Sequence, residues 1–327
     1  MPCSWPIVNE AIAQLRDGGD GKVMLKAGGV DVIDRVKEGI DRPTRLVNIR
    51  NIAGLDKITE DATGVKIGPM VTLAQLDASP VIRRKYTALA DAAGHAATPQ
   101  IRNQATVGGN LLQRPRCWYF RNQDFHCLKK GGARCFAQEG ENEYHAVFGN
   151  KVCAIVHPSA AGVALMALGA KLEITGARGK REVAIENFWV RPEEDIRREN
   201  SLNADEMITS INIPAPVGNT SSAYMKLGEK ESFDWPVSEV AVSLTQARGG
   251  IVGARVVLGA AAPVPLRLKE VESALLKKTW SEENLRAAAS LATKGATPLD
   301  NNTYKLPIIE TMVRRTLVAA TSGLSEG

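Results

Sequence analysis

Residues 101–112 read Ile-Arg-Asn-Gln-Ala-Thr-Val-Gly-Gly-Asn-Leu-Leu, and residues 26–31 read Lys-Ala-Gly-Gly-Val-Asp. Paired glycines can take positive φ and let backbone N–H groups approach a ligand, and a following helix N-terminus favours a diphosphate. Thr106 and Asn110 are candidate side-chain donors. One such turn is more often purely structural, but two together predict a diphosphate site. Neither matches the G-x-G-x-x-G fingerprint or the P-loop, which argues against an NAD- or NTP-binding fold.

Four of the five cysteines follow within 37 residues: Cys117, Cys127, Cys135 and Cys153. They are separated by 9, 7 and 17 residues, a spacing that fits neither zinc fingers nor ferredoxin runs. Clustered thiols without a disulfide framework favour a soft metal or an iron–sulfur cluster. A [4Fe–4S] cluster is the first interpretation. The alternatives are simple burial, or zinc held by three cysteines with one of three histidines: His126, His145 or His157.

Five basic residues lie among these cysteines: Arg114, Arg116, Arg121, Lys129 and Lys130. Positive charge near a thiol lowers its pKa and offsets the negative charge of a cluster. We therefore expect these residues to surround the metal site. The alternative is that they form a solvated face.

Composition indicates a soluble globular protein of two or three domains. The chain has 327 residues, 44% hydrophobic and 24% charged, with a formal net charge of +5. This mild charge does not indicate nucleic-acid binding, and no apolar run is long enough to span a membrane. The start lacks the pattern of an export signal, which predicts a cytoplasmic protein. No hydrolytic motif is present, so we predict no catalytic residue and an electron-relay role.

The pattern of elements predicts an α+β fold in three units. Residues 1–54 read as helix, strand, helix and strand, a βαβ-like unit. Residues 55–215 form a second α/β unit with a helix from Pro80 past Leu89 and an insertion at 113–157. Residues 216–327 predict an antiparallel sheet, with strands at 239–245 and 253–259, and a helical bundle at 268–276, 282–292 and 307–319.

Several motifs together resemble the FAD-binding medium subunits of the xanthine dehydrogenase and carbon monoxide dehydrogenase family. They are the two glycine stretches, Ile67-Gly68 with Thr72-Leu73, residues 113–120, His157-Pro158-Ser159, Tyr224-x-Lys226 and Ser232-Phe233-Asp234. The cysteine segment looks most like the branch with an extra cluster, which includes flavin subunits of bacterial periplasmic aldehyde oxidoreductases. The resemblance covers essentially the whole chain.

The resemblance implies two FAD-binding subdomains of the PCMH type and a C-terminal domain of the CO dehydrogenase flavoprotein type. It implies that FAD contacts Lys26, Ala27, Gly28, Gly29, Val30, Asp31, Val32, Ile33, Asp34, Ile101, Ala105, Thr106, Gly108, Gly109, Asn110 and Lys230. The [4Fe–4S] cluster would be held by Cys117, Cys127, Cys135 and Cys153.

The family also implies partners: a large molybdenum-cofactor subunit and a small subunit with two [2Fe–2S] clusters, in a heterotrimer or its dimer. Electrons would reach FAD from the small subunit and leave to an external acceptor. Export folded with a signal-bearing partner is an alternative to a cytoplasmic location. A self-sufficient flavin oxidase and a zinc-stabilised scaffold protein are the competing functions.

The sequence departs from the family pattern at a few positions. Ala160 replaces the aspartate that usually follows His-Pro-Ser, which removes a carboxylate from the expected FAD contacts. Gly228-Glu229-Lys230 stands where an Arg-rich stretch is common, and Val30 replaces a common threonine. Because the two sites use different loops, replacing Cys127 is expected to remove the cluster and spare the flavin. A bulky residue at position 109 is expected to do the reverse.

Overall fold

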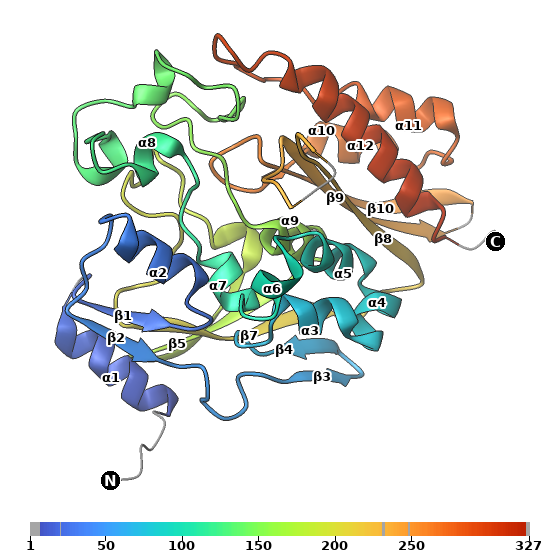
Figure 1. The fold of residues 1–327 in the computed structure, drawn as a ribbon. Helices are drawn as coiled ribbons and strands as arrows, with labels where there is room; N and C mark the ends of the chain where they lie inside the picture. The colour runs from blue at the N-terminus through green and yellow to red at the C-terminus, as the bar shows by residue number, and fades with distance from the viewer. Residues whose placement is uncertain (1–6, 20, 231–232, 248, 325–327) are drawn as a thin grey trace.

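The computed structural model describes residues 7–19, 21–230, 233–247 and 249–324. Within these residues three sheets carry the fold, and helices cover them (Figure 1). The N-terminal unit lies at one end of the molecule and the C-terminal helices lie at the other. The predicted α+β fold class is confirmed.

The first unit is a parallel βαβ element preceded by a helix. Strand β1 (Val23–Lys26) pairs in parallel with β2 (Arg45–Asn48), and helix α2 (Val30–Lys37) connects them. Helix α1 (Val8–Gly18) packs against this pair, with three residues facing the shared core: Ala11, Ile12 and Leu15. This core is separate from the two larger ones, and Leu55, Met70 and Met207 of the second unit complete it.

The second unit is built on a five-stranded antiparallel sheet in the order β3-β4-β7-β5-β6. Its strands are β3 (Ile58–Asp61), β4 (Gly64–Ile67), β5 (Lys171–Gly176), β6 (Gly179–Ala184) and β7 (Glu206–Pro214). β4 pairs with β7 although the two are far apart in the sequence. The cysteine segment therefore lies in the long stretch of chain that connects β4 to β7, which are neighbours in the sheet.

Short helices join the strands of this second sheet. They are α3 (Leu73–Ala78), α4 (Pro80–Lys85), α5 (Thr87–Gly94), α6 (Pro99–Arg102), α7 (Val107–Leu111), α9 (Ala160–Ala167) and the 3₁₀ turn η3 (Ile185–Asn187). Every residue of α9 is buried. A helix that is apolar on all sides must lie inside the protein, and α9 packs between α5 and the third sheet.

The helix predicted from Pro80 past Leu89 is two helices, so that prediction is wrong. The helical geometry breaks at Tyr86, which has φ −138° and ψ 51° between α4 and α5. The Tyr86 ring is buried, and its hydroxyl donates to the carbonyl oxygen of Pro214 over 3.2 Å. A long-range contact with the end of β7 accompanies the break, and the local helix pattern carries no sign of it.

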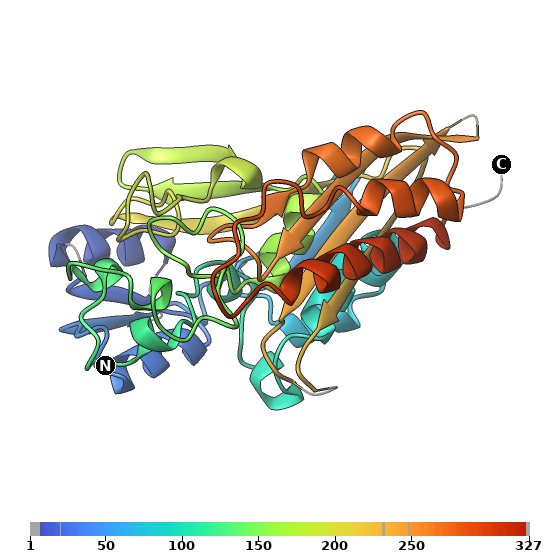
Figure 2. The same cartoon turned by 90° about the horizontal axis from the view of Figure 1, so that it is seen from above.

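The third unit is a four-stranded antiparallel sheet in the order β11-β10-β9-β8. Its strands are β8 (Asn219–Leu227), β9 (Ser238–Ala247), β10 (Gly250–Gly259) and β11 (Leu266–Arg267). Three helices cover one face (Figure 2): α10 (Lys269–Leu275), α11 (Glu282–Ala289) and α12 (Lys305–Thr321). The helices α5 and α9 contact the same sheet, so the third unit shares a core with the second.

The cysteine segment contains little regular structure. Its helices are α8 (Trp118–Arg121) and the 3₁₀ turns η1 (Leu128–Lys130) and η2 (Phe136–Gln138). In Figure 1 it forms the looped region around α8, next to α2. This position brings arginines of the segment within reach of acidic residues on α2.

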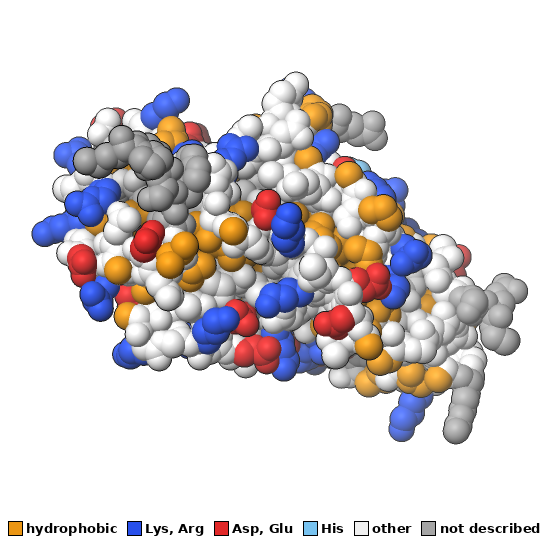
Figure 3. Space-filling view, turned by 90° about the horizontal axis from the view of Figure 1, so that it is seen from below, with side chains coloured by type: hydrophobic (Ala, Val, Ile, Leu, Met, Phe, Trp, Pro, Cys, Tyr) orange, Lys and Arg blue, Asp and Glu red, His pale blue; other side chains and the backbone are white. Residues whose placement is uncertain are grey.

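The face seen from below carries both charge signs. Figure 3 shows Lys and Arg side chains interspersed with Asp and Glu, and small groups of hydrophobic side chains between them. None of the described helices combines the length and hydropathy that a membrane-spanning helix requires.

Candidate flavin and cysteine sites

A cavity of about 400 Å³ lies where the three units meet, within the size range of ligand pockets. Most of the predicted cofactor residues line it: Ala27, Gly28, Gly29, Val30, Asp31, Val32, Asp34, Ile101, Ala105, Thr106, Gly108, Gly109 and Asn110. Three predicted residues do not: Lys26, Ile33 and Lys230. The fold therefore brings both glycine stretches to one cavity.

The first glycine pair forms the turn between β1 and α2. Gly29 has φ 88°, the left-handed region that favours glycine, and stands at the N-cap of α2. A Cβ on Gly28 would lie 1.9 Å from the carbonyl oxygen of Gln104, so this turn packs directly against the start of the second glycine stretch. The N-terminus of α2 borders the cavity, which favours an anionic group there.

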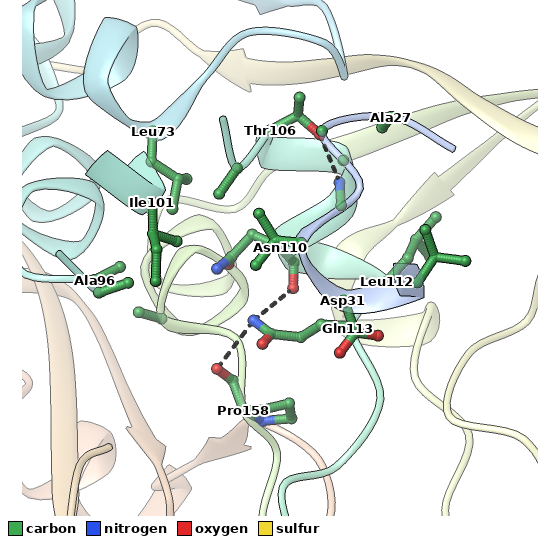
Figure 4. A pocket seen from close by; sticks show the side chains of 18 of the residues that line it. Ala27, Asp31, Leu73, Ala96, Ile101, Thr106, Asn110, Leu112, Gln113 and Pro158 are labelled. Atoms are coloured by element: carbon green, nitrogen blue, oxygen red, sulfur yellow. Dashed lines mark hydrogen bonds between the residues drawn. The ribbon is translucent and has the colours of Figure 1, made fainter. Parts of the chain in front are cut away.

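The second glycine pair lies inside helix α7, so the expected positive φ is wrong there. The Thr106 hydroxyl accepts a hydrogen bond from the Gly109 N–H over 3.1 Å (Figure 4), which is an N-cap contact. A Cβ on Gly108 would meet Pro69 at 2.8 Å. A Cβ on Gly109 would come within 4 Å of Thr106 Oγ1 alone. Gly109 therefore presents an open backbone surface to the cavity.

Polar contacts tie the end of α7 to the start of α9. The side-chain oxygen of Asn110 accepts hydrogen bonds from Ser159 Oγ at 2.7 Å and from the Ala161 N–H at 3.3 Å. The side-chain nitrogen of Gln113 donates to the carbonyl oxygens of Asn110 and Pro158, at 3.0 and 3.2 Å (Figure 4). The oxygen end of the Asn110 amide is thus engaged within the protein.

Of the His157-Pro158-Ser159 motif, Pro158 lines the same cavity. Ala160 lines it with a methyl group, at the position where the resemblance implied a carboxylate. His157 is buried, its ring centroid lies 4.3 Å from that of Trp189, and burial lowers its pKa to about 3. His157 is therefore neutral near pH 7, and it contributes packing rather than charge.

The third unit closes the cavity with charged residues that the sequence analysis did not assign. Glu239 on β9 is 1% exposed, lines the cavity and accepts a hydrogen bond from the Tyr224 hydroxyl at 2.5 Å. Burial raises the pKa of Glu239 to about 7, although this hydrogen bond opposes the rise. Lys226 on β8 also lines the cavity, and its Nζ donates to the Asp234 carbonyl oxygen over 3.0 Å. Lys230 is exposed.

One signal could have identified Glu239: it is a lone acid in the apolar strand Ser238–Ala247. Buried acids are rare unless paired or functional. Of the third-unit motif Ser232-Phe233-Asp234, the residues at 233 and 234 line the cavity, whereas Ser232 lies outside the described residues.

All four predicted cysteine ligands line a second, small cavity of about 10 Å³: Cys117, Cys127, Cys135 and Cys153. All four are free thiols. Part of the wall is aromatic, formed by Tyr119, Phe120 and Phe136. The sequence therefore correctly indicated residues that converge on one place.

His145 is the one candidate histidine in this wall, and its Nε2 lies 3.2 Å from Cys117 Sγ. His126 and His157 do not line this cavity. Within the part of the chain that the structure describes, which excludes Cys3, no group of three or more His, Cys, Asp or Glu is arranged to hold a metal ion.

The arginines of the segment contact carboxylates rather than thiols, contrary to the expectation. Arg114 Nη2 lies 2.9 Å from Glu199 Oε1. Arg116 and Arg121 lie 2.9 and 2.7 Å from Asp31 Oδ1. These guanidinium groups are therefore neutralised by acids of the first and second units.

The thiol pKa values follow burial and thiol–thiol contact. Burial raises the pKa of Cys117 to about 12. A hydrogen bond between Cys135 and Cys153 lowers the pKa of Cys135 to about 6 and raises that of Cys153. The arginines are not among the main causes, because their charge is already engaged. Lys129 makes a minor contribution that lowers the pKa of Cys153.

Two family profiles match the chain in succession. The FAD binding domain in molybdopterin dehydrogenase matches residues 6–216. The CO dehydrogenase flavoprotein C-terminal domain matches residues 222–320. The first match alone covers more than half of the chain.

Known relatives match nearly the full length. The aldehyde oxidoreductase FAD-binding subunit PaoB of Escherichia coli (strain K12) is 34% identical over 297 residues, 90% of this chain and 88% of that protein. The carbon monoxide dehydrogenase medium chain of Hydrogenophaga pseudoflava is 28% identical over 318 residues, 96% of this chain and 94% of that protein.

A solved structure shows the same fold. Carbon monoxide dehydrogenase from Hydrogenophaga pseudoflava, in a form that lacks the Mo-pyranopterin moiety of the molybdenum cofactor, matches with a TM-score of 0.76 at 27% identity. The match covers 98% of this chain and 96% of that chain. The chain therefore belongs to the FAD-binding medium subunits of the xanthine dehydrogenase and carbon monoxide dehydrogenase family, and it is an oxidoreductase subunit.

Proposed function

We propose that the chain is the FAD- and [4Fe–4S]-binding electron-transfer subunit of a molybdenum-containing hydroxylase of the aldehyde oxidoreductase type. In this proposal it receives electrons from a small [2Fe–2S] subunit and passes them to an external acceptor. A large molybdenum-cofactor subunit oxidises the substrate. FAD and the cluster, when bound, would be the electron carriers of this subunit.

The observation that carries the proposal is the single cavity at which both glycine stretches meet. Gly28 packs against Gln104, so the N-terminus of α2 and the open backbone at Gly109 border the same space. The N-terminus of α2 suits a diphosphate, the open surface at Gly109 leaves room beside it, and the apolar remainder suits flat ring systems. The residues present therefore fit FAD.

The cysteine cavity supports the second carrier by its chemistry. Four sulfur donors around one point match the ligand set of a [4Fe–4S] cluster. A cluster gives each thiolate its own iron, so the four thiols need not meet at one ion. The aromatic wall would shield such a group from water.

Further parts of the proposal concern partners and location. The large and small subunits remain proposed partners, and a cytoplasmic location, or export with a signal-bearing partner, remains a proposal. The unit boundaries after residues 54 and 215 are likewise proposed. Membership in a flavoprotein family leaves no reason to retain the zinc-stabilised scaffold, whereas a self-sufficient flavin oxidase is still a testable alternative.

Cofactor analysis of the purified chain tests the proposal. We expect FAD identified by mass spectrometry after acid release, with about four iron and four acid-labile sulfide per chain. Protein with neither flavin nor iron would contradict it. The variant Cys127→Ser should lose iron, whereas the matched control Cys3→Ser, outside the four-cysteine set, should keep it.

A second measurement separates the flavin oxidase alternative. An aldehyde or N-heterocycle is added to the isolated chain without oxygen, and flavin absorption is followed. No reduction is expected, because the proposed function assigns substrate oxidation to the large subunit. Rapid bleaching of the flavin would favour the oxidase.

A further inference from the structure

Helix α2 is tied to the cysteine segment by ion pairs centred on Asp31. One carboxylate oxygen of Asp31 lies 2.7 Å from Arg121 Nη2 and 2.9 Å from Arg116 Nη2. The other oxygen accepts a hydrogen bond from the Arg114 backbone N–H over 3.2 Å. Asp31 is in the first turn of α2 and lines the flavin cavity. One carboxylate at the cavity is thus held by three residues of the segment that carries the cysteines.

Arg121 links both ends of α2 to that segment. Besides Asp31, its guanidinium reaches Glu38 at the C-cap of α2, with Nη1 3.1 Å from Oε2. Its Nε donates to the Pro115 carbonyl oxygen over 2.8 Å, which fixes the loop that holds Cys117. The Arg121 side chain is 8% exposed and that of Asp31 is 13% exposed. These contacts are therefore shielded from water.

The electrostatics keep both partners charged. Burial alone would raise the pKa of Asp31, but the charges of Arg116 and Arg121 outweigh it and hold that pKa below its usual value. Burial would lower the pKa of Arg121, yet its bonds to Asp31 and Glu38 raise it. Asp31 also pairs with Arg35 of α2, at 3.1 Å, and with Arg116, so removal of Arg121 would weaken the compensation of this buried charge and break the contact between α2 and the segment.

Arg116 extends the link to the third unit. Its guanidinium lies 4.7 Å from the ring centroid of Trp235, and both residues line the flavin cavity. Its Nη1 lies 3.1 Å from Asp34 Oδ2. The segment that carries the cysteines thus supplies part of the flavin cavity wall.

We infer that FAD binding and ordering of the cysteine segment are thermodynamically coupled, with Arg121 as the positioning residue that acts through Asp31. The inference rests on the proposed function, because it concerns the same flavin site. A ligand that orders the start of α2 favours the state in which Asp31 meets the arginines. Linkage then requires that an ordered cysteine segment strengthens FAD binding by the same factor. This replaces the expectation that loss of the cluster spares the flavin.

The test uses the full-length chain freed of iron by a chelator and of FAD by dialysis. Iodoacetamide alkylation of the four thiols is followed by mass spectrometry, with and without saturating FAD. In the wild type we expect FAD to slow alkylation of Cys135 by about 5-fold or more, the lower end of typical coupling. The reverse arm compares the FAD Kd of cluster-loaded and cluster-free protein, and the cluster-loaded form should bind FAD about 5-fold or more tightly.

Two variants and a control identify the residue. In Arg121→Gln, FAD affinity should fall about 5-fold or more and FAD should no longer protect Cys135. Arg121→Lys keeps the charge but cannot reach Asp31 and Glu38 together, so it should restore part of both effects. The control Arg286→Gln removes an exposed ion pair with Glu282 and should behave as wild type. Thermal midpoints of all variants show which of them fold.

The outcomes separate this inference from the proposed function. Wild-type protein that binds FAD but shows equal alkylation rates would overturn the inference alone. So would an Arg121→Gln protein with a lower thermal midpoint but normal FAD protection, which is the result of a merely structural role. If neither Arg121 variant folds, the wild-type protection and the reciprocal Kd comparison decide. Wild-type protein that binds no FAD would overturn both proposals.

Discussion

The flavin cavity and the cysteine cavity are built in different ways. The first encloses about 400 Å³, with walls from Leu25 to Glu239 in the sequence. The second encloses about 10 Å³, with walls from residues 117–155 alone. Strands and helices with packed cores frame the first, whereas three short helical turns support the second. A cavity framed by packed cores keeps its shape without a ligand, and a ring of side chains in a loop depends on what holds the loop.

The cysteine segment is fastened to each unit by polar contacts. Asp31 holds it to the first unit, as described above. Lys129 Nζ lies 2.7 Å from Glu199 Oε1 and holds it to the second. Lys305 Nζ donates to the carbonyl oxygen of His145 over 3.1 Å and holds it to the third. Its order therefore depends on a few charged groups, and on the proposed cluster when it is bound, rather than on an apolar core of its own.

The largest expected effect comes from removing one thiol. Cys153→Ser should lose the cluster and open the segment, which raises proteolytic cleavage within residues 122–151 about 100-fold, equivalent to about 3 kcal/mol of local stability. Limited proteolysis with mass mapping measures this. Cleavage spread evenly over all three units would show that the segment is not a separate, weakly held region.

The glycine contact offers a test on the side of the flavin cavity. Gly28→Ala should reduce the free energy of unfolding of the FAD-free chain by about 1 to 3 kcal/mol, because its Cβ would overlap the Gln104 carbonyl oxygen. The matched variant Gly109→Ala should change that free energy by less than about 1 kcal/mol yet weaken FAD binding. Urea titrations and FAD titrations check both. Equal destabilisation by the two variants would contradict the distinction.

Glu239, in the wall of the flavin cavity, should make the free energy of unfolding depend on pH. The pKa of its carboxyl is 4.5 in the unfolded chain and about 7 in the folded protein. The free energy of unfolding therefore falls as pH rises through this range and stays low above it. Glu239→Gln removes the ionisation and still accepts the Tyr224 hydrogen bond. Its advantage over wild type should grow by about 2 to 3 kcal/mol between pH 5 and pH 8. Thermal midpoints at both pH values measure it, and a constant difference would speak against a neutral buried acid.

The smallest effect is expected from a substitution of Trp235 in the wall of the flavin cavity. Trp235 is 53% exposed and stacks on Arg116, a contact worth about 0.5 to 1 kcal/mol at exposed sites. Because Trp235 also lines the flavin cavity, Trp235→Ala should weaken FAD binding about 2- to 5-fold and lower the thermal midpoint only slightly. A Kd titration monitored by flavin fluorescence checks this. A large fall in the midpoint would place Trp235 in the core instead.

The sequence alone identified the cavity-lining residues that lie in recognisable local motifs. The glycine pairs and the four cysteines were assigned because each stretch carries its own signal. The Asp31–Arg121 pair joins residues 90 positions apart, and no local pattern tells which acid an arginine meets. Lys226 lines the cavity and Lys230 does not, because a sequence motif fixes position along the chain and not side-chain direction.

The fold was predictable to a similar extent. The first unit and the C-terminal helices follow from apolar periodicity. Strand β8 was missed because it begins with the polar run Asn219–Ser222, and pairing with β9 rather than its own pattern makes it a strand. The interruption at Tyr86 depends on the distant end of β7, which a reading of the helix alone cannot include.

The contact between Gly28 and Gln104 also limits how this protein can evolve. While the Gln104 carbonyl stays where it is, natural selection can accept no side chain at position 28, because even a methyl group would overlap it. A drift of either stretch is tolerated only if the other moves with it. The backbone positions of the two glycine stretches therefore constrain each other, although the stretches lie far apart in the sequence.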